Sequence, residues 1–195
     1  FIGIAGALSK MLVIKGGTID TTGTMMMIIS LSLGAIVGEM LDLDGKMIHF
    51  GEWLKIKTGN AKDKKFVDGF VMASLTVCIG AMAVVGSIED GIHADHSILF
   101  AKAILDFVII LVMSATLGKG CLFSFVPVGL FQGTITLLAS LISPFITTSA
   151  MSALSYIGSI LIFCVGVNLV FNTKIRVANL LPALIVACIC TVFPL

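Results

Sequence analysis

Two ionisable residues stand near the middle of a long apolar run, where charge is costly. Asp106 lies near the centre of residues 98–118, and Lys102 precedes it by four positions. That spacing places both side chains on one helix face, where they can pair. Ionisable groups at membrane depth face a bundle interior or a water-filled cavity. The pattern indicates either a neutralised ion pair that joins helices or a binding and proton-coupling carboxylate.

Three amides lie in or beside other apolar runs. Gln132 stands between Gly129 and Gly133, whose spacing permits close helix contact. It is either an interhelical hydrogen-bonding group or a donor to a substrate. Asn168 and Asn179 flank a short connection between two runs, where capping competes with ligand binding as their role.

Two carboxylates stand at the ends of apolar runs. Glu39 follows the Gly34-xxx-Gly38 segment, and Asp68 begins the next run at a similar depth. Both are either ordinary interface carboxylates beside a lysine-rich segment or members of a substrate pathway.

A metal site is the weaker of two interpretations of residues 87–97. Oxygen and imidazole ligands suit several divalent cations. The candidate ligands are Glu89, Asp90, His93, Asp95 and His96, with the first three foremost. Their loose spacing favours a solvated acidic loop.

Enzyme signatures are missing from the sequence. It contains no Walker loop, HExxH, GxSxG or CxxC motif. The five cysteines lie in or beside apolar runs, as packing residues do. We therefore expect no enzymatic activity and no cofactor, and an intramembrane enzyme or metal protein is the third-ranked hypothesis.

The composition is that of a chain solvated by lipid. Hydrophobic residues make up 58% and charged residues 12% of the sequence, and the mean hydropathy is +1.15. A soluble domain has about 25% charged residues. The near-zero net charge gives no electrostatic basis for nucleic-acid binding, so the bilayer is the expected partner.

The elements that must position these residues are membrane-spanning helices. A helix crosses the hydrocarbon core with about 20 apolar residues. The candidate spans are residues 24–43, 66–86, 98–118, 121–142, 153–172 and 177–195, and residues 1–14 resemble the second half of another. The fold class is therefore all-α, a polytopic transmembrane bundle with about seven spans in a single domain, 1–195.

Lysine and arginine predict the orientation. They occur in residues 44–65, 119–120 and 173–176, and are missing from 87–97 and 143–152. The positive-inside rule makes the basic loops cytoplasmic. Within 46–57, Met47, Phe50 and Leu54 share one helix face, which predicts an amphipathic helix in the cytoplasmic interface or one that docks a partner.

A faint repeat relates residues 24–43 and 66–86 to 153–172 and 177–195. Val67, Ala73 and Cys78 match Val177, Ala183 and Cys188 without gaps. The repeat suggests a parallel duplication with halves 1–95 and 96–195, as in some carriers.

Eight segments resemble the YdfK/YqgA family of bacterial inner-membrane proteins, a domain of unknown function. They are residues 33–42 (LGAIVGEMLD), 51–54 (GEWL), 66–70 (FVDGF), 86–91 (GSIEDG), 116–120 (TLGKG), 131–133 (FQG), 166–169 (GVNL) and 177–183 (VANLLPA). The resemblance implies a multi-pass protein of the bacterial inner (plasma) membrane. It also implies that about one and a half further helices precede Phe1, for eight spans in a four-plus-four duplication.

These observations favour a small transporter or channel-like permease for an unidentified solute or ion. Asp106 and Gln132 are its leading pathway residues, with Lys102, Glu39, Asp68, Asn168 and Asn179 as further candidates. The alternative is a non-transporting membrane scaffold or sensor that acts through 46–57. The small-residue pairs Gly34/Gly38 and Gly129/Gly133 allow close packing within one bundle or in a homodimer.

Overall fold

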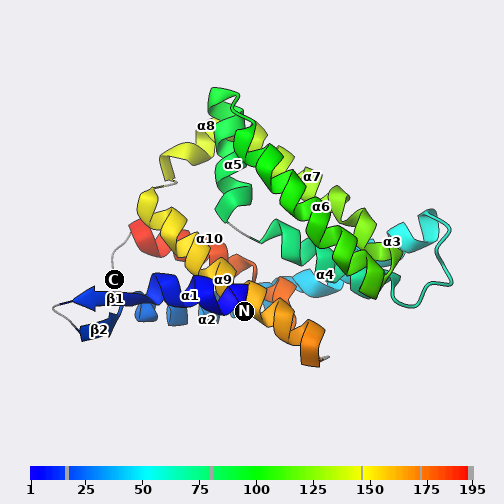
Figure 1. Ribbon diagram of the computed structural model, residues 1–195, viewed down its shortest axis with the longest axis horizontal. Helices are drawn as coiled ribbons and strands as arrows, with labels where there is room; N and C mark the ends of the chain where they lie inside the picture. The colour runs from blue at the N-terminus through cyan, green and yellow to red at the C-terminus, as the bar shows by residue number, and fades with distance from the viewer. Residues whose placement is uncertain (16–17, 80, 146, 172, 193–195) are drawn as a thin grey trace. The chain divides into compact units, whose positions relative to one another are not determined.

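The chain folds into two compact, mostly helical units. The computed structural model describes residues 1–15, 18–79, 81–145, 147–171 and 173–192 (Figure 1). One unit comprises Phe1–Leu43 with Pro144–Leu195, and the other comprises Asp44–Ser143. These boundaries differ from those of the suggested repeat halves, and the duplication stays a prediction.

The first unit pairs α1 with α9 and α2 with α10. Its helices are α1 (Ile2–Met11), α2 (Thr24–Leu41), α9 (Thr148–Phe171), the 3-10 helix η3 (Val177–Leu180) and α10 (Pro182–Val192). Gly34 lies against Ala183, and Gly38 lies against the backbone of Asn179, so closely that neither site has room for a Cβ atom. The close packing predicted for Gly34 and Gly38 is therefore present within the bundle.

A β-hairpin follows α1 and corrects the helix expected over residues 1–14. Strand β1 (Leu12–Lys15) pairs antiparallel with β2 (Thr18–Thr21), and Ile14 lies opposite Ile19. The helix therefore ends at Met11. Residues 12–14 are Leu-Val-Ile, and β-branched side chains favour an extended backbone once a partner strand is within reach.

The second unit contains a helix over residues 46–57 and the largest fully buried side chains, Phe66 and Phe70. Its elements are α3 (Leu43–Lys57), α4 (Phe66–Cys78), α5 (Ala81–His93), α6 (Ser97–Leu117), the 3-10 helix η1 (Lys119–Ser124), α7 (Phe125–Leu137) and α8 (Ala139–Ile142). The 3-10 helix η2 (Ser143–Phe145) lies where the chain passes back into the first unit. Leu54 of α3 packs with Phe66 and Phe70 of α4. Trp53 is half exposed and stacks on Phe50.

Gly118 ends α6 and allows a sharp change of direction. Its φ of 89° lies in the region that favours glycine. Two residues later, Gly120 lies against the Phe66 backbone so closely that a Cβ atom has no room. The pair of glycines brings η1 onto α4 and places the start of α7 in the same unit.

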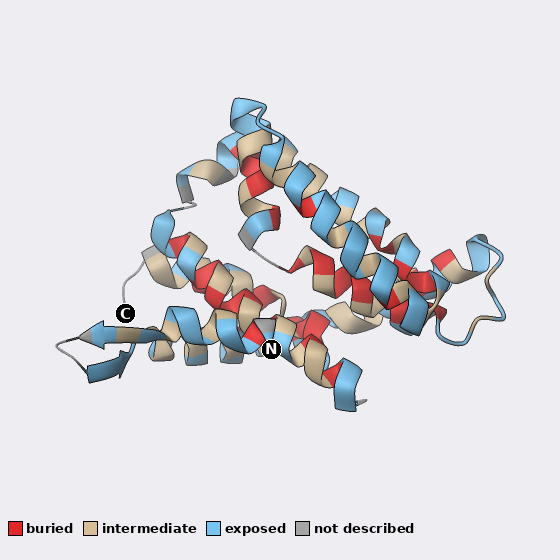
Figure 2. Cartoon of the chain, in the orientation of Figure 1, coloured by how far each residue is buried: buried red, intermediate tan, exposed pale blue. Residues whose placement is uncertain are grey.

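The surface of α6 is apolar and its buried face carries a charge. Its large exposed apolar side chains are Phe100, Ile104, Leu105, Phe107, Val108, Ile109, Leu111 and Val112 (Figure 2). Lys102, by contrast, is buried. This distribution is the reverse of that on a helix facing water, and it fits a lipid-facing surface.

Four described helical segments are long and apolar enough to cross a membrane. They are Thr24–Leu41, Ser97–Leu117, Lys119–Leu137 and Thr148–Phe171, and the pair α4–α5 makes a fifth if it counts as one bent span. α1 and α10 coincide with the other predicted spans but have only 10 and 11 residues. The structure thus supports four to five spans, and the figure of about seven stays a prediction.

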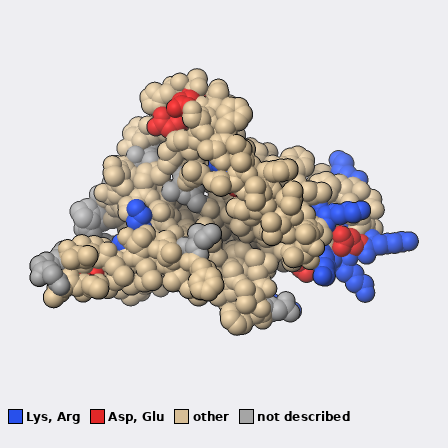
Figure 3. Space-filling view, in the orientation of Figure 1, with Lys and Arg blue, Asp and Glu red and all other residues tan. Residues whose placement is uncertain are grey.

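Charge is segregated along the second unit. Basic side chains gather where α3 and the loop after it lie, and acidic side chains gather where α5 is followed by α6 (Figure 3). α6 runs from the acidic end to the basic end, because Asp95 lies two residues before its first residue and Lys119 two residues after its last.

Candidate functional site

The predicted span 66–86 is broken near its middle. α4 ends at Cys78, and Ile79 has an extended backbone with φ −79° and ψ 116°. The axis of α5 differs from that of α4 by 62°. The last carbonyl groups of a helix have no N–H partner within it and carry partial negative charge. The break therefore leaves carbonyl oxygens of α4 to be satisfied by another element.

Lys102 supplies a hydrogen-bond donor to the end of α4. Its Nζ donates to the carbonyl oxygen of Val77 at 2.9 Å. It also forms an ion pair with the Asp106 carboxylate, one turn along α6. The side chain of Lys102 is 8% exposed and that of Asp106 is 21% exposed. The pairing expected from the four-residue spacing is present, and it also joins α6 to α4.

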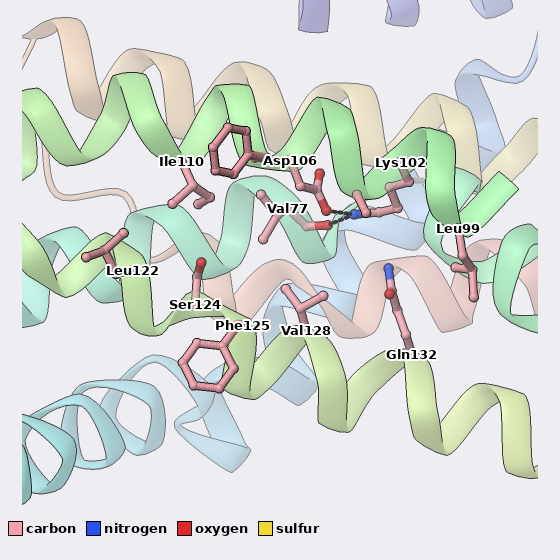
Figure 4. Close-up of a pocket in the computed structure, with 12 residues that line it drawn as sticks. Val77, Leu99, Lys102, Asp106, Ile110, Leu122, Ser124, Phe125, Val128 and Gln132 are labelled. Atoms are coloured by element: carbon pink, nitrogen blue, oxygen red, sulfur yellow. Dashed lines mark hydrogen bonds and ion pairs between the residues drawn. The ribbon is translucent and has the colours of Figure 1, made fainter. Parts of the chain in front are cut away.

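A cavity of about 340 Å³ adjoins this ion pair. Its lining comprises Val77, Leu99, Lys102, Ala103, Asp106, Phe107, Ile110, Leu122, Ser124, Phe125, Val128 and Gln132. Lys102 and Asp106 contribute polar groups from α6, Gln132 and Ser124 contribute them from α7 and η1, and the remaining lining residues are apolar (Figure 4). A few convergent polar groups in an apolar cavity of this size are typical of small-ligand sites.

The structure therefore brings three of the predicted residues together. Asp106, Lys102 and Gln132 line one cavity within the second unit. Asp68 belongs to the same unit but is exposed in the first turn of α4, and it is not among the lining residues.

The first unit holds a separate polar cluster at the start of η3. Glu39 Oε1 accepts a hydrogen bond from Arg176 at 2.7 Å, and Glu39 Oε2 accepts one from Asn179 at 2.6 Å. The side chains of Arg176 and Glu39 are 58% and 63% exposed. The Glu39 arrangement resembles an interface ion pair more than a buried binding site.

Asn168 caps the connection between α9 and η3. Its Nδ2 donates to the carbonyl oxygen of Ile175 at 2.8 Å, and its Oδ1 accepts from the Ile175 N–H at 3.0 Å. Thr173 donates to the same oxygen at 2.7 Å. All the polar atoms of the amide are thus engaged in holding the turn, which favours the capping role.

The acidic segment at the end of α5 forms two histidine–carboxylate pairs. His93 bonds Glu89 at 2.7 Å, and His96 bonds Asp90. Among the described residues no three His, Cys, Asp or Glu side chains converge in a way that could hold a metal ion. Asp95 accepts hydrogen bonds from Ser97, which lower the pKa of its carboxyl below the ordinary value of 3.8.

Two features of these sites were not predicted from the sequence. The Val77 carbonyl becomes available only because α4 ends at Cys78, and Gly80 within the apolar run was the only signal of a break. The sequence indicates only a role in membrane orientation for Arg176, and its pairing with Glu39 is a finding of the structure. By contrast, the expected close contact at Gly129 and Gly133 is missing from the described chain, since a Cβ atom at either position would meet nothing within 4 Å.

Comparison with known proteins identifies the family but supplies no activity. A family model described as "Protein of unknown function (DUF554)" matches residues 1–192. The chain is 27% identical over 168 residues to "Uncharacterized membrane protein YdfK" of Bacillus subtilis, covering 86% of this chain and 70% of that protein. It is 28% identical over 165 residues to "Uncharacterized protein YqgA" of Escherichia coli, covering 83% and 70%. No solved structure matches the chain.

The match over nearly the whole chain agrees with the resemblance found in the sequence motifs. The membrane character printed for one relative agrees with the apolar outer surface of α6 and with the long apolar helices. This chain belongs to the DUF554 family and is a membrane protein.

Proposed function

We propose that this protein is a small secondary transporter or channel-like permease whose solute or ion passes through the cavity beside Lys102 and Asp106. The observation that carries the proposal is the buried ion pair at the end of a broken helix. Transporters place substrate and coupling-ion sites at such helix breaks, near the middle of the membrane. A purely structural ion pair has no need of the adjoining cavity of about 340 Å³.

We also propose that the protein crosses the bacterial plasma membrane several times and that its basic loops are cytoplasmic. The two charged ends of the second unit support this orientation, because α3 and its loop carry lysines while the α5–α6 connection carries none. An alkaline phosphatase reporter inserted after Ala94 is expected to be active, and one inserted after Asn60 inactive. The reversed result would overturn the orientation.

Flux through reconstituted full-length protein tests the transport proposal. Proteoliposomes would be assayed with a panel of tracers: sodium, potassium, chloride, a small carboxylate and a neutral polar solute. We expect flux of at least one tracer that Asp106→Asn abolishes. Asp68→Asn is the matched control, because its carboxylate is exposed and lies outside the cavity lining. Equal rates for wild type, Asp106→Asn and empty liposomes would overturn the proposal.

A scaffold or sensor acting through α3 is the second candidate. It is favoured by half-exposed Trp53, whose ring lies 4.7 Å from the Lys57 ammonium, because an exposed aromatic beside a cation suits an interface or a partner. This alternative predicts that reversing the charge of the α3 lysines abolishes function in cells, while Asp106→Asn is tolerated.

A further inference from the structure

The Lys102–Asp106 ion pair keeps hydrogen-bonding capacity that the described residues do not use. A lysine ammonium has three N–H donors, and a carboxylate has two acceptor oxygens. Lys102 donates to the Val77 carbonyl oxygen and to Asp106 Oδ2. One Lys102 donor and Asp106 Oδ1 therefore have no partner in the described part of the chain, and both residues line the cavity. A ligand in the cavity can pair with both.

Gln132 adds a further polar group to the same cavity. Its half-buried side chain points from α7 toward the side of the cavity that α6 forms (Figure 4). The amide has two N–H donors and an acceptor oxygen, and it forms no hydrogen bond with any described residue. Buried polar groups without partners cost free energy. A polar ligand that reaches Gln132 is therefore favoured over an apolar one.

The charges on the cavity lining select against simple ions. An anion bound at Lys102 would be repelled by the Asp106 carboxylate, and a cation bound at Asp106 would be repelled by the Lys102 ammonium. A zwitterion presents the opposite charge to each group and brings no net charge into an apolar cavity. Lys102 and Asp106 are in direct contact. The two charges of the ligand must therefore also be close together, as they are on the single carbon of an α-amino acid.

We propose that the cavity binds the zwitterion of a small apolar α-amino acid, with its ammonium at the Asp106 carboxylate and its carboxylate at the Lys102 ammonium and the Gln132 amide. This proposal rests on the proposed transport function and names its substrate class. The end of α4 carries partial negative charge, which also favours the ammonium on the side of the Val77 carbonyl.

The size and the remaining lining of the cavity fit the side chain of such a ligand. The volume of about 340 Å³ is near the lower end of the range of about 300–1,000 Å³ that is typical of small-molecule sites. Leu99, Ile110, Phe125 and Val128 are among the apolar residues that complete the lining. An apolar side chain of the ligand is buried against them, whereas glycine leaves that surface without a partner.

Direct binding tests the proposal. Purified full-length protein in detergent is titrated with radiolabelled glycine, L-alanine, L-valine, L-leucine and L-phenylalanine in a scintillation proximity assay. We expect saturable binding, at about one molecule per chain, of at least one apolar amino acid, and tighter binding of it than of glycine. No saturable binding of any of the five, or binding of glycine as tight as that of the others, would overturn the proposal.

Competition with analogues tests which groups of the ligand are recognised. The amide of the tightest ligand lacks the carboxylate, its deaminated acid lacks the ammonium, and ε-aminocaproate is an isomer of leucine with the two charges far apart. Each should compete at least about tenfold less well than the amino acid, because each loses a charge-assisted hydrogen bond. Equal competition by any of them would overturn the proposal. Equal competition by phosphoethanolamine would do so too, because it would identify the ligand as a lipid headgroup.

Charge variants assign the binding to the ion pair. Asp106→Asn and Lys102→Gln should each weaken binding at least about tenfold. The double variant Lys102→Met/Asp106→Asn removes both charges, so it tests binding without an unpaired charge if a single variant fails to fold. Asp68→Asn is the control, because its carboxylate is exposed and lies outside the cavity lining. Wild-type affinity in the double variant would contradict the assignment.

A selectivity variant places the ligand in the cavity. Val128→Phe fills part of the apolar lining without touching either charge, so it should weaken the binding of leucine or phenylalanine more than that of alanine. Leu130→Phe is the matched control on α7, because Leu130 is 64% exposed and is not a lining residue. The same change in selectivity from both variants would contradict a ligand at this cavity.

The outcome is separable from that of the transport assay, to whose tracer panel the tightest-binding amino acid is added. Asp106-dependent flux of an ion or another solute, without binding of any amino acid, would overturn the zwitterion site and leave transport standing. Amino-acid binding that depends on Asp106, without Asp106-dependent flux of any tracer, would support the site and overturn transport.

Discussion

Lys102 of α6 donates a hydrogen bond of 2.9 Å to the carbonyl oxygen of Val77, 25 positions earlier in the chain. The bond stands in for the N–H that α4 would have supplied had it continued past Cys78. The Lys102 ammonium thus provides a hydrogen-bond donor at the end of α4, forms an ion pair with Asp106 and borders the cavity.

The first prediction concerns the stability of the ion pair. Lys102→Met leaves the Asp106 carboxylate without its partner, and we expect a loss of about 3 kcal/mol. The double variant Lys102→Met/Asp106→Asn should recover most of that loss, because it removes both charges. Thermal unfolding of the four proteins in one detergent measures the cycle. Additive losses in the double variant would show that the two side chains do not depend on each other.

The second prediction concerns the close approach of α2 to η3. Gly38→Ala places a Cβ atom against the Asn179 backbone, and overpacking of this kind costs about 1–3 kcal/mol. Gly129→Ala is the matched control in α7, where a Cβ atom would meet nothing within 4 Å. We expect the control to be neutral or to stabilise, since alanine is the better helix former by about 0.8 kcal/mol. A lower melting temperature for Gly129→Ala than for Gly38→Ala would contradict this packing.

The third prediction concerns the Glu39–Arg176 pair. Both side chains are more than half exposed, and an ion pair of this kind contributes no more than about 1 kcal/mol. Glu39→Gln should therefore lower the melting temperature slightly, and less so in high salt. A loss as large as that of Lys102→Met would show that the Glu39 cluster is buried in the functional protein.

The fourth prediction concerns the acid response of the α5–α6 connection. Hydrogen bonds from Ser97 stabilise the charged form of Asp95 and lower its pKa below 3.8. The resulting stabilisation is present above that pH and is lost as the pH falls through the lower, folded-state pKa. Ser97→Ala should raise the Asp95 pKa, because it removes the hydroxyl and keeps the backbone donor. A carboxyl titration followed by NMR measures it, and an unchanged midpoint would contradict the role of Ser97.

The sequence predicted local side-chain pairings better than it predicted the path of the chain. The four-residue spacing of Lys102 and Asp106 fixed their pairing, since both lie on one continuous helix. The capping role of Asn168, one of two interpretations left open, is the one its hydrogen bonds favour. Local geometry determines both features, and spacing along the chain is sufficient to detect it.

Features that depend on distant contacts were not predictable in the same way. The break after Cys78 lies within an apolar run, and its free carbonyl is tolerable only because Lys102 reaches it from another helix. The hairpin after Met11 was hidden because Leu12, Val13 and Ile14 are as apolar as a helix would require. The suggested repeat rests on three matches, and the two compact units have different boundaries.

The most direct test of the central claim is whether Gln132 can be reached by water from both sides of the membrane. Gln132→Cys would be made in a background with the five native cysteines replaced, and labelled in oriented vesicles with a membrane-impermeant thiol reagent. Asn60→Cys serves as the one-sided control, and Val112→Cys, on the exposed apolar face of α6, as the lipid-facing control. Labelling of Gln132→Cys from both sides, with Asn60→Cys labelled from one side and Val112→Cys from neither, is the predicted result. Labelling of Gln132→Cys from neither side would show a sealed bundle and contradict a pathway at this cavity.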